Sequence, residues 1–95
     1  MGKKRDKLTL IFDVLNVIRS NKNAIKPTRL LRYSNLSSQG FLEYYGELLN
    51  RGFVQENKNE KGRKTISLTD KGFKFLEKYQ MIRGFIDDFE LNGMM

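Results

Sequence analysis

The sequence contains no cysteine and no histidine among its 95 residues. Without cysteine there is no disulfide framework, and without either residue the usual zinc ligands, the thiol nucleophile and the commonest general base are missing. No apolar run approaches the roughly 20 residues that span a bilayer, and the basic N-terminus lacks the apolar stretch of a signal peptide. We therefore expect a cytoplasmic protein that is not an enzyme and that uses no cofactor, metal or small-molecule ligand.

Positive charge is concentrated in the first part of the chain. The formal net charge is +7. Residues 1–69 carry 14 basic and 6 acidic side chains, a net of +8, whereas residues 70–95 carry 4 basic and 5 acidic side chains, a net of −1. The first part is typical of a surface that binds a polyanion, although basic residues also serve simply to keep a small domain soluble. The hydrophobic residues, 39% of the chain, are spread along it and indicate one folded domain.

Hydrophobic periodicity predicts three helices in the first half of the chain, at about 6–20, 27–33 and 37–50. The second begins with proline, which suits the first helical position, and Ser37 is a good N-cap for the third. A turn at 34–35 separates these two helices. The residues expected to face the core are Leu8, Ile11, Phe12, Val14, Leu15, Ile18, Leu30, Leu31, Tyr33, Leu36, Phe41, Tyr45, Leu48 and Leu49.

Two short strands and a long helix are predicted in the second half. Gly52 is placed to end the third helix in a left-handed conformation. The strands span 53–56 and 65–68, and the polar, basic segment between them reads as a hairpin tip. Thr69 caps the last helix, which runs to about residue 91. Residues 24–26, between the first two helices, form either a short strand or a linker.

This order of elements predicts an α+β, mostly α fold: a winged helix-turn-helix of three helices and a β-hairpin wing, followed by a long C-terminal helix. In such a fold the third helix enters the major groove with its N-terminal residues at base edges, and the wing is free to reach the backbone or the minor groove. We take residues 1–69 as a DNA-binding domain and residues 70–95 as a dimerisation helix, the two forming one structural unit.

Five groups of residues carry a resemblance to a known family. They are Leu36-Ser37, Tyr44-Tyr45, Leu48-Leu49, Gly52-Phe53 and Leu68-Thr69-Asp70-Lys71-Gly72. With these groups in this order, nearly the whole chain resembles the archaeal winged-helix regulators and small chromatin-type proteins that dimerise through a long C-terminal helix. The resemblance implies binding to double-stranded DNA and antiparallel pairing of the last helices. The chain departs from the family in having few basic residues on the third helix, which argues against strong base readout there.

Candidate DNA contacts lie on four segments. On the third helix, Gln39 is able to read adenine, Ser38 serves bases or phosphates, and Leu42 touches a thymine methyl group; the alternative is that they are ordinary solvent-facing residues. Basic residues in the N-terminal arm, the second helix and the hairpin tip are expected to engage phosphates with little sequence preference. The complete predicted set is Lys3, Lys4, Arg5, Arg29, Arg32, Ser37, Ser38, Gln39, Leu42, Lys58, Lys61, Arg63 and Lys64.

The last helix has an apolar pattern that is typical of a coiled-coil seam. Its apolar residues alternate at spacings of four and three, as the a and d positions of heptads do. A helix of about 22 residues is roughly 33 Å long, so part of it should project from the domain and require a partner. Phe73 and Leu76 lie on another side of the helix and are expected to pack on its own domain. The alternative to a projecting helix is that the whole helix folds back on that domain. The predicted homodimer interface is Phe75, Tyr79, Ile82, Phe85, Ile86 and Phe89.

Three functions remain open at the level of sequence. The first is double-stranded DNA binding as a homodimer, either by a transcriptional regulator with a defined operator or by a sequence-tolerant, nucleoid-associated protein of the chromatin type. The second is a winged helix used for protein–protein interaction, and the third is RNA binding. Acidic residues near the C-terminus are interpreted as solubilising groups.

Overall fold

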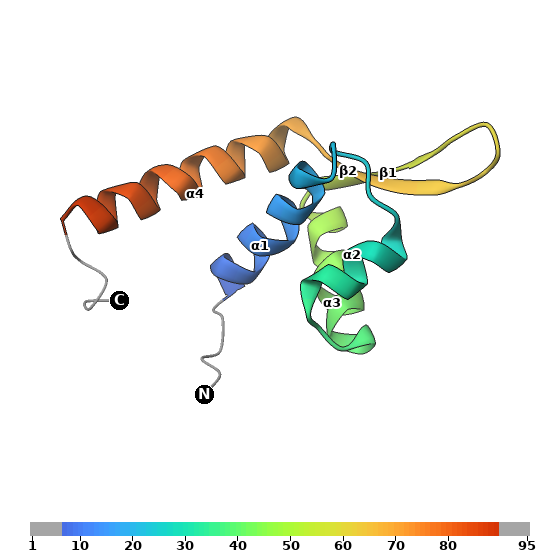
Figure 1. Cartoon of the computed structure of the whole chain (residues 1–95), viewed down its shortest axis with the longest axis horizontal. Helices are drawn as coiled ribbons and strands as arrows, with labels where there is room; N and C mark the ends of the chain where they lie inside the picture. The colour runs from blue at the N-terminus through green and yellow to red at the C-terminus, as the bar shows by residue number, and fades with distance from the viewer. Residues whose placement is uncertain (1–6, 90–95) are drawn as a thin grey trace.

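The computed structural model describes residues 7–89 and confirms the predicted order of elements (Figure 1). Three helices are followed by a two-stranded antiparallel hairpin and a long helix, which is the mostly helical α+β fold that the sequence predicts. The elements are α1 (Lys7–Ser20), α2 (Pro27–Ser34), α3 (Ser38–Asn50), β1 (Val54–Lys58), β2 (Lys64–Leu68) and α4 (Asp70–Asp88).

Helix α1 lies in the middle of the molecule, between α4 on one side and α2 and α3 on the other (Figure 1). Its buried face carries Leu15 and Ile18, both fully buried, and every other element contributes to the same core. Leu8 was expected on this face but is 59% exposed. It lies in the first turn of α1, where it lines an open hollow with Phe53 and Phe75 and is left uncovered. The buried core comprises Leu10, Ile11, Val14, Leu15, Ile18, Ile25, Leu30, Phe41, Leu48, Val54, Ile66, Leu68 and Leu76.

Side-chain and backbone caps define the helix ends near the turn. Asn35 ends α2 in the left-handed conformation, with φ of 59°. The Oγ of Ser37 accepts a hydrogen bond from the backbone N of Gly40 at 3.0 Å, which confirms Ser37 as the N-cap of α3. Gly52 has φ of +76° and ends the α3 segment as predicted. Tyr33 and Leu49, expected to face the core, are 52% and 37% exposed because they lie at the solvent-facing edges of their helices.

The hairpin is longer than its sequence pattern indicates. Its register pairs Val54 with Leu68 at the base and Lys58 with Lys64 at the outer end. The predicted tip therefore shrinks to residues 59–63, because polar residues on both sides of it pair as strand. Ile25 joins Ile66 in an isolated antiparallel bridge, so the connection before α2 is a very short strand rather than a simple linker.

The long helix begins with a close approach to the hairpin. Thr69 accepts a hydrogen bond from the backbone N of Gly72 at 3.1 Å, which confirms it as the N-cap of α4. Gly72 is buried against the carbonyl of Phe53, where a larger residue does not fit. From this junction α4 and the wing project in opposite directions (Figure 1). No helix within residues 7–89 is both long and apolar enough to cross a membrane.

Candidate nucleic-acid interface

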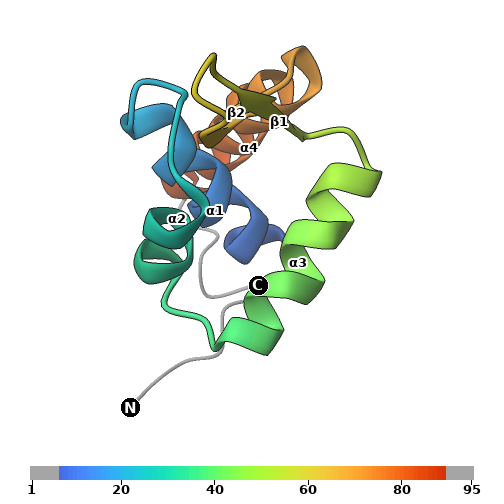
Figure 2. The same ribbon diagram turned by 90° about the vertical axis from the view of Figure 1, so that its right-hand side faces the viewer.

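The outward face of α3 carries the residues predicted to meet bases. Ser38, Gln39 and Leu42 are all exposed, Leu42 to 66%, and the exposed Gly46 lies one further turn along. The opposite face is held by Phe41 and Leu48, which are buried in the core. Viewed from the side to which the wing points, α2 and α3 lie below the wing (Figure 2). The face of α3 that bears Gln39 is therefore available to a ligand.

The acidic residues of α3 differ in their surroundings. Glu43 is exposed on the outward side of the helix. Glu47 accepts from Lys7 Nζ at 2.7 Å and from Arg51 Nε at 2.8 Å, so two cations offset its charge. The hydrogen bond to Lys7, followed by that to Arg51, lowers the pKa of Glu47 below its ordinary value of 4.5. Of these two acids, Glu43 is therefore the one that would repel an approaching phosphate.

Basic residues gather along α2 and in the connection before it. Arg29 and Arg32 are exposed, one turn apart, and neither forms an ion pair with a residue in the described range 7–89. Arg29 also lines a hollow of about 350 Å³ together with Lys22 and Lys26. Sequence reasoning missed these two lysines, although Lys26 is the residue before α2 and Lys22 lies in the short connection that precedes it. Pro27 could have indicated these lysines, because it marks the N-terminus of α2 and, in a helix-turn-helix, this helix meets the DNA backbone.

The wing presents its cations around a turn that is held by side-chain hydrogen bonds. Asn59 organises the turn: its Oδ1 accepts from the backbone N of Lys61 and of Arg63, each at 2.9 Å. Lys58, Lys61 and Arg63 are exposed and form no ion pair within the part of the chain that the structure describes. Lys64 is also exposed, but its Nζ lies 3.5 Å from the carboxylate of Glu56. Three of the four predicted wing cations are thus free to meet phosphates.

The helix–turn–helix with an adjacent wing also matches a known family over most of the chain. Residues 4–86 fit the winged helix-turn-helix family. This protein belongs to the winged helix-turn-helix family. Over 79 residues it is 30% identical to MJ0290 of Methanocaldococcus jannaschii. The match covers 83% of this chain and 34% of that relative, so the chain spans about a third of the relative's length.

Solved structures share the winged helix-turn-helix fold with this protein. Sso10a-2, a DNA-binding protein from Sulfolobus solfataricus, has a TM-score of 0.66 at 19% identity, over 95% of this chain and 94% of that one. The PcaV transcriptional regulator from Streptomyces coelicolor has a TM-score of 0.66 at 18% identity, over 84% and 63% of the two chains. F-93 of SSV1 has a TM-score of 0.64 at 19% identity, over 94% and 99%.

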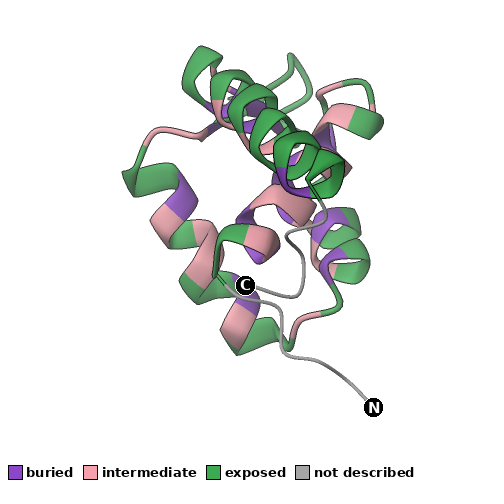
Figure 3. Ribbon diagram, turned by 90° about the vertical axis from the view of Figure 1, so that its left-hand side faces the viewer, coloured by how far each residue is buried: buried purple, intermediate pink, exposed green. Residues whose placement is uncertain are grey.

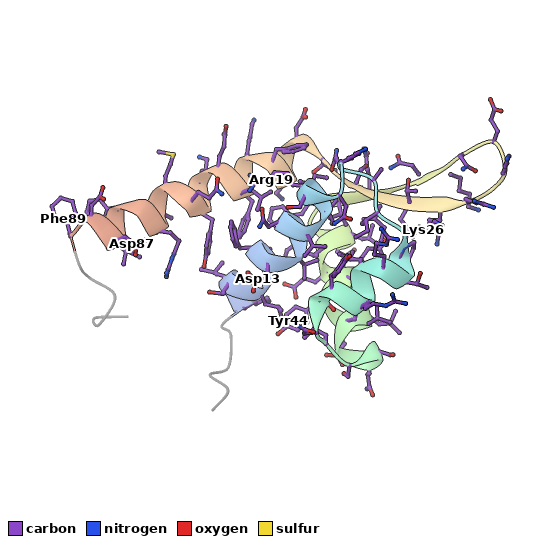
Figure 4. All side chains as sticks on the ribbon, viewed as in Figure 1. Asp13, Arg19, Lys26, Tyr44, Asp87 and Phe89 are labelled. Atoms are coloured by element: carbon purple, nitrogen blue, oxygen red, sulfur yellow. The ribbon has the colours of Figure 1, made fainter. Side chains whose placement is uncertain are left out.

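Figure 4 places Lys26 on the side of the wing, and Asp87 and Phe89 at the far end of α4. The predicted arm of Lys3, Lys4 and Arg5 lies outside the described residues. Within the described part of the chain, no group of three or more acidic residues is placed to hold a metal ion.

The predicted dimer seam needs correction at its inner end. Phe75 and Tyr79 were expected to face a partner, but both pack on the chain's own domain. The ring of Tyr79 stacks on that of Phe12 with centroids 4.4 Å apart, and its hydroxyl shares a 3.0 Å hydrogen bond with Thr9. Phe75 lies against Phe53, with ring centroids 5.3 Å apart. The reason is that α4 crosses α1, so the inner half of this apolar stripe is covered by α1 and the β1 junction.

The outer half of α4 keeps a different apolar stripe exposed. Ile82, Phe85 and Phe89 are 58%, 57% and 63% exposed, and Met81 beside them is 73% exposed. Exposed residues dominate the visible face of α4 in Figure 3. Ile86, also predicted at the interface, is buried instead, at 5% exposure. Leu76 packs in the core as predicted, whereas Phe73, expected beside it, is 39% exposed.

Lysines replace the apolar residues of this stripe nearer to the domain. Phe85 follows Lys71 and Lys78 at intervals of seven residues, so all three occupy one heptad position. Both lysines are exposed, but Lys71 Nζ donates to the backbone carbonyl of Arg51 at 2.7 Å and lies 5.1 Å from the ring centroid of Phe53. The stripe is therefore basic toward the domain, where Lys71 also contacts the chain's own domain, and apolar near the tip.

Proposed function

We propose that this protein binds double-stranded DNA as a homodimer, with α3 in the major groove and with α2 and the wing on the flanking phosphates. The observation that carries the proposal is the exposed, nearly uncharged face of α3 set between free cations of α2 and the wing. The names of two fold neighbours, the DNA-binding protein Sso10a-2 and the PcaV transcriptional regulator, support the same function. Such a role associates the protein with the nucleoid in the cytoplasm.

Phosphate contacts supply most of the affinity in this proposal. Arg29, Arg32, Lys61 and Arg63 are the principal candidates, and Lys22 and Lys26 extend the basic surface at the start of α2. Engaging five or six phosphates gives a slope of log K against log salt of about −5. Phosphate contacts position a protein without specifying sequence, so binding is largely sequence-tolerant unless Gln39 and its neighbours read bases.

Fluorescence anisotropy with a labelled duplex tests the DNA-binding function. The wild-type protein should bind at low salt with the steep slope given above. Replacing Arg29 and Arg32 together by alanine should flatten the slope by about 2, because two phosphate contacts are lost. The matched control replaces Lys74 and Lys78 of α4, which removes the same charge far from α3 and should leave the slope nearly unchanged. No duplex binding, or tighter binding of single-stranded RNA, would refute the proposal.

Selection of bound DNA from a random pool separates the two kinds of DNA-binding protein. An enriched motif that disappears in Gln39→Ala identifies a regulator whose α3 reads bases. A pool that stays random identifies sequence-tolerant, chromatin-type binding. The low charge of α3 and the cations around it favour the second result.

Dimerisation is proposed through the outer half of α4, with Ile82, Phe85 and Phe89 as the seam. A parallel pair would place each Lys78 against its own copy in the partner, and like charges at a seam are unfavourable. An antiparallel pair that overlaps only at the helix tips leaves Lys78 outside. In this arrangement Phe85 lies near the twofold axis and Ile82 faces Phe89 of the partner subunit.

The absence of native cysteine makes this pairing testable by disulfide cross-linking. Phe85→Cys should cross-link to itself under mild oxidation, because the two copies of this residue meet near the axis. Phe89→Cys alone should cross-link poorly but should join Ile82→Cys when the two variants are mixed. Gln80→Cys, also exposed on α4 but away from the seam, is the control. Equal self-linking by all seam variants would indicate a parallel pair, and a monomer in sedimentation would remove the homodimer.

A further inference from the structure

A side-chain hydrogen bond joins the wing to α3. Tyr45 Oη donates to Glu56 Oε2 at 2.5 Å, and Glu56 Oε1 lies 3.5 Å from Lys64 Nζ. We propose that Tyr45 and Glu56 form a brace that sets the position of the wing relative to the outward face of α3, and so selects the phosphates that the wing reaches. The proposal rests on the DNA-binding function given above. It adds Tyr45 and Glu56 as positioning residues and gives a role to Lys64.

The wing needs such a brace because its outer half has no core beneath it. At the base of the hairpin, Val54, Ile66 and Leu68 are buried. Beyond the rung of Glu56 and Ile66, the paired residues are exposed or half-buried. An isolated two-stranded ribbon is only marginally stable in water, so the direction of its outer rungs depends on side-chain contacts near the base. Glu56 is placed at the last rung that still touches the core.

The helix side of the brace is anchored in the core. The ring of Tyr45 stacks nearly parallel to that of Phe41, with centroids 5.5 Å apart, and Phe41 is itself buried. Packing on Phe41 therefore positions the half-buried ring that carries the Tyr45 hydroxyl. Burial, followed by the hydrogen bond to Glu56, raises the pKa of Tyr45 well above its ordinary value of 10.0. The same bond is the main cause that lowers the pKa of Glu56, so at neutral pH a neutral donor meets an ionised acceptor.

The other face of the hairpin is tied internally. Ser67 Oγ accepts from Asn57 Nδ2 at 2.8 Å and from Gln55 Nε2 at 3.3 Å. These bonds link β1 to β2 without reaching α3, so they stiffen the ribbon but do not orient it. The brace fixes the direction of the ribbon relative to α3. It also draws Lys64 toward Glu56 and away from the wing cations that are proposed to contact phosphates.

Tyr45→Phe tests the brace because it removes the hydroxyl and keeps the ring. In the free protein, NMR order parameters of residues 57–64 should fall while the fold is retained. Duplex binding should weaken about fivefold, since an unrestrained wing must be ordered on binding. Hydroxyl-radical footprinting should show lost protection at the flanks and unchanged protection at the centre. Tyr44→Phe is the matched control, because the Tyr44 hydroxyl has no hydrogen bond to any residue that the structure describes.

Glu56→Gln tests the consequence for Lys64. A glutamine still accepts a hydrogen bond from Tyr45 but no longer pairs with Lys64, so the salt slope should steepen by about 1 as this cation becomes free. Glu60→Gln removes the same charge from the wing tip, where the described residues offer no ion partner, and should change the slope less.

The outcomes separate the brace from the DNA-binding function. The brace would be overturned if Tyr45→Phe left the NMR order parameters of the wing, the affinity for duplex and the footprint unchanged. That result would leave the DNA-binding function intact. Equal slopes for Glu56→Gln and Glu60→Gln would overturn the role given to Lys64. A wild-type protein that fails to bind duplex would refute the proposed function, and the NMR measurement would still decide whether Tyr45 holds the wing.

Discussion

Gly72 is the position where a single methyl group should do the most damage. A Cβ built there lies 2.3 Å from the carbonyl oxygen of Phe53 and 3.4 Å from Cβ of Leu68. The oxygen belongs to the backbone and accepts from the backbone N of Thr69 at 3.1 Å, so it cannot turn away as a flexible side chain would. Gly72→Ala must therefore move the start of α4 away from the hairpin.

The size of the effect follows from two opposing contributions. Overpacking against a fixed neighbour costs about 3 kcal/mol, while alanine gains about 1 kcal/mol of helix propensity over glycine. The net loss is about 2 kcal/mol, which corresponds to a fall in Tm of roughly 8–16 °C for a domain of this size. Differential scanning calorimetry and urea unfolding measure it directly.

Two other helical glycines provide matched controls for this experiment. A Cβ at Gly46 or Gly84 meets no described atom within 4 Å. Alanine at either position should raise stability by about 0.5–1 kcal/mol, because helix propensity improves without a clash. If Gly72→Ala is as stable as these two variants, the close approach of α4 to the hairpin is wrong.

Three further predictions concern turns, caps and pH. Lys22→Gly should raise stability by up to about 1 kcal/mol in urea unfolding, because Lys22 has φ of 62°; a loss would show that its side chain matters more than its backbone. Thr69→Ala should lower Tm, costing about 1 kcal/mol for the lost N-cap, whereas Thr69→Ser should retain most of it. Stability from Glu47 should be present above pH 4.5 and be lost as the pH falls through its lowered pKa, since Lys7 and Arg51 favour the ionised form. Acid titration of Glu47→Gln should lack this loss, and an identical profile would contradict it.

Local signals in the sequence were sufficient to predict the order of the helices and strands and the positions of most helix ends. Ser37, Gly52 and Thr69 act through hydrogen bonds or backbone angles that involve residues a few positions away, so their roles can be read from short segments. The outward face of α3 was predictable for a related reason. Once Phe41 and Leu48 are assigned to the core, helical geometry places Gln39 and Leu42 on the other side.

Boundaries that depend on pairing were less predictable. The outer rungs of the hairpin consist of polar residues such as Asn57 and Lys58, which resemble a loop when taken alone. They form strand because the opposite residues continue the register set by the buried base. Lys22 and Lys26 were missed although they lie seven and three residues before Arg29, with which they line one hollow.

Patterns in the sequence were enough to predict a winged helix-turn-helix with a basic first part and an amphipathic last helix. Only the tertiary structure decided which apolar face of that helix is free. The heptad spacing contains both Tyr79 and Ile82, and periodicity assigns them to one seam. The stacking of Tyr79 on Phe12 uses the inner residues for the chain's own core. Ile82, Phe85 and Phe89 remain exposed because α4 extends beyond α1, and a sequence pattern cannot show where a neighbouring element ends.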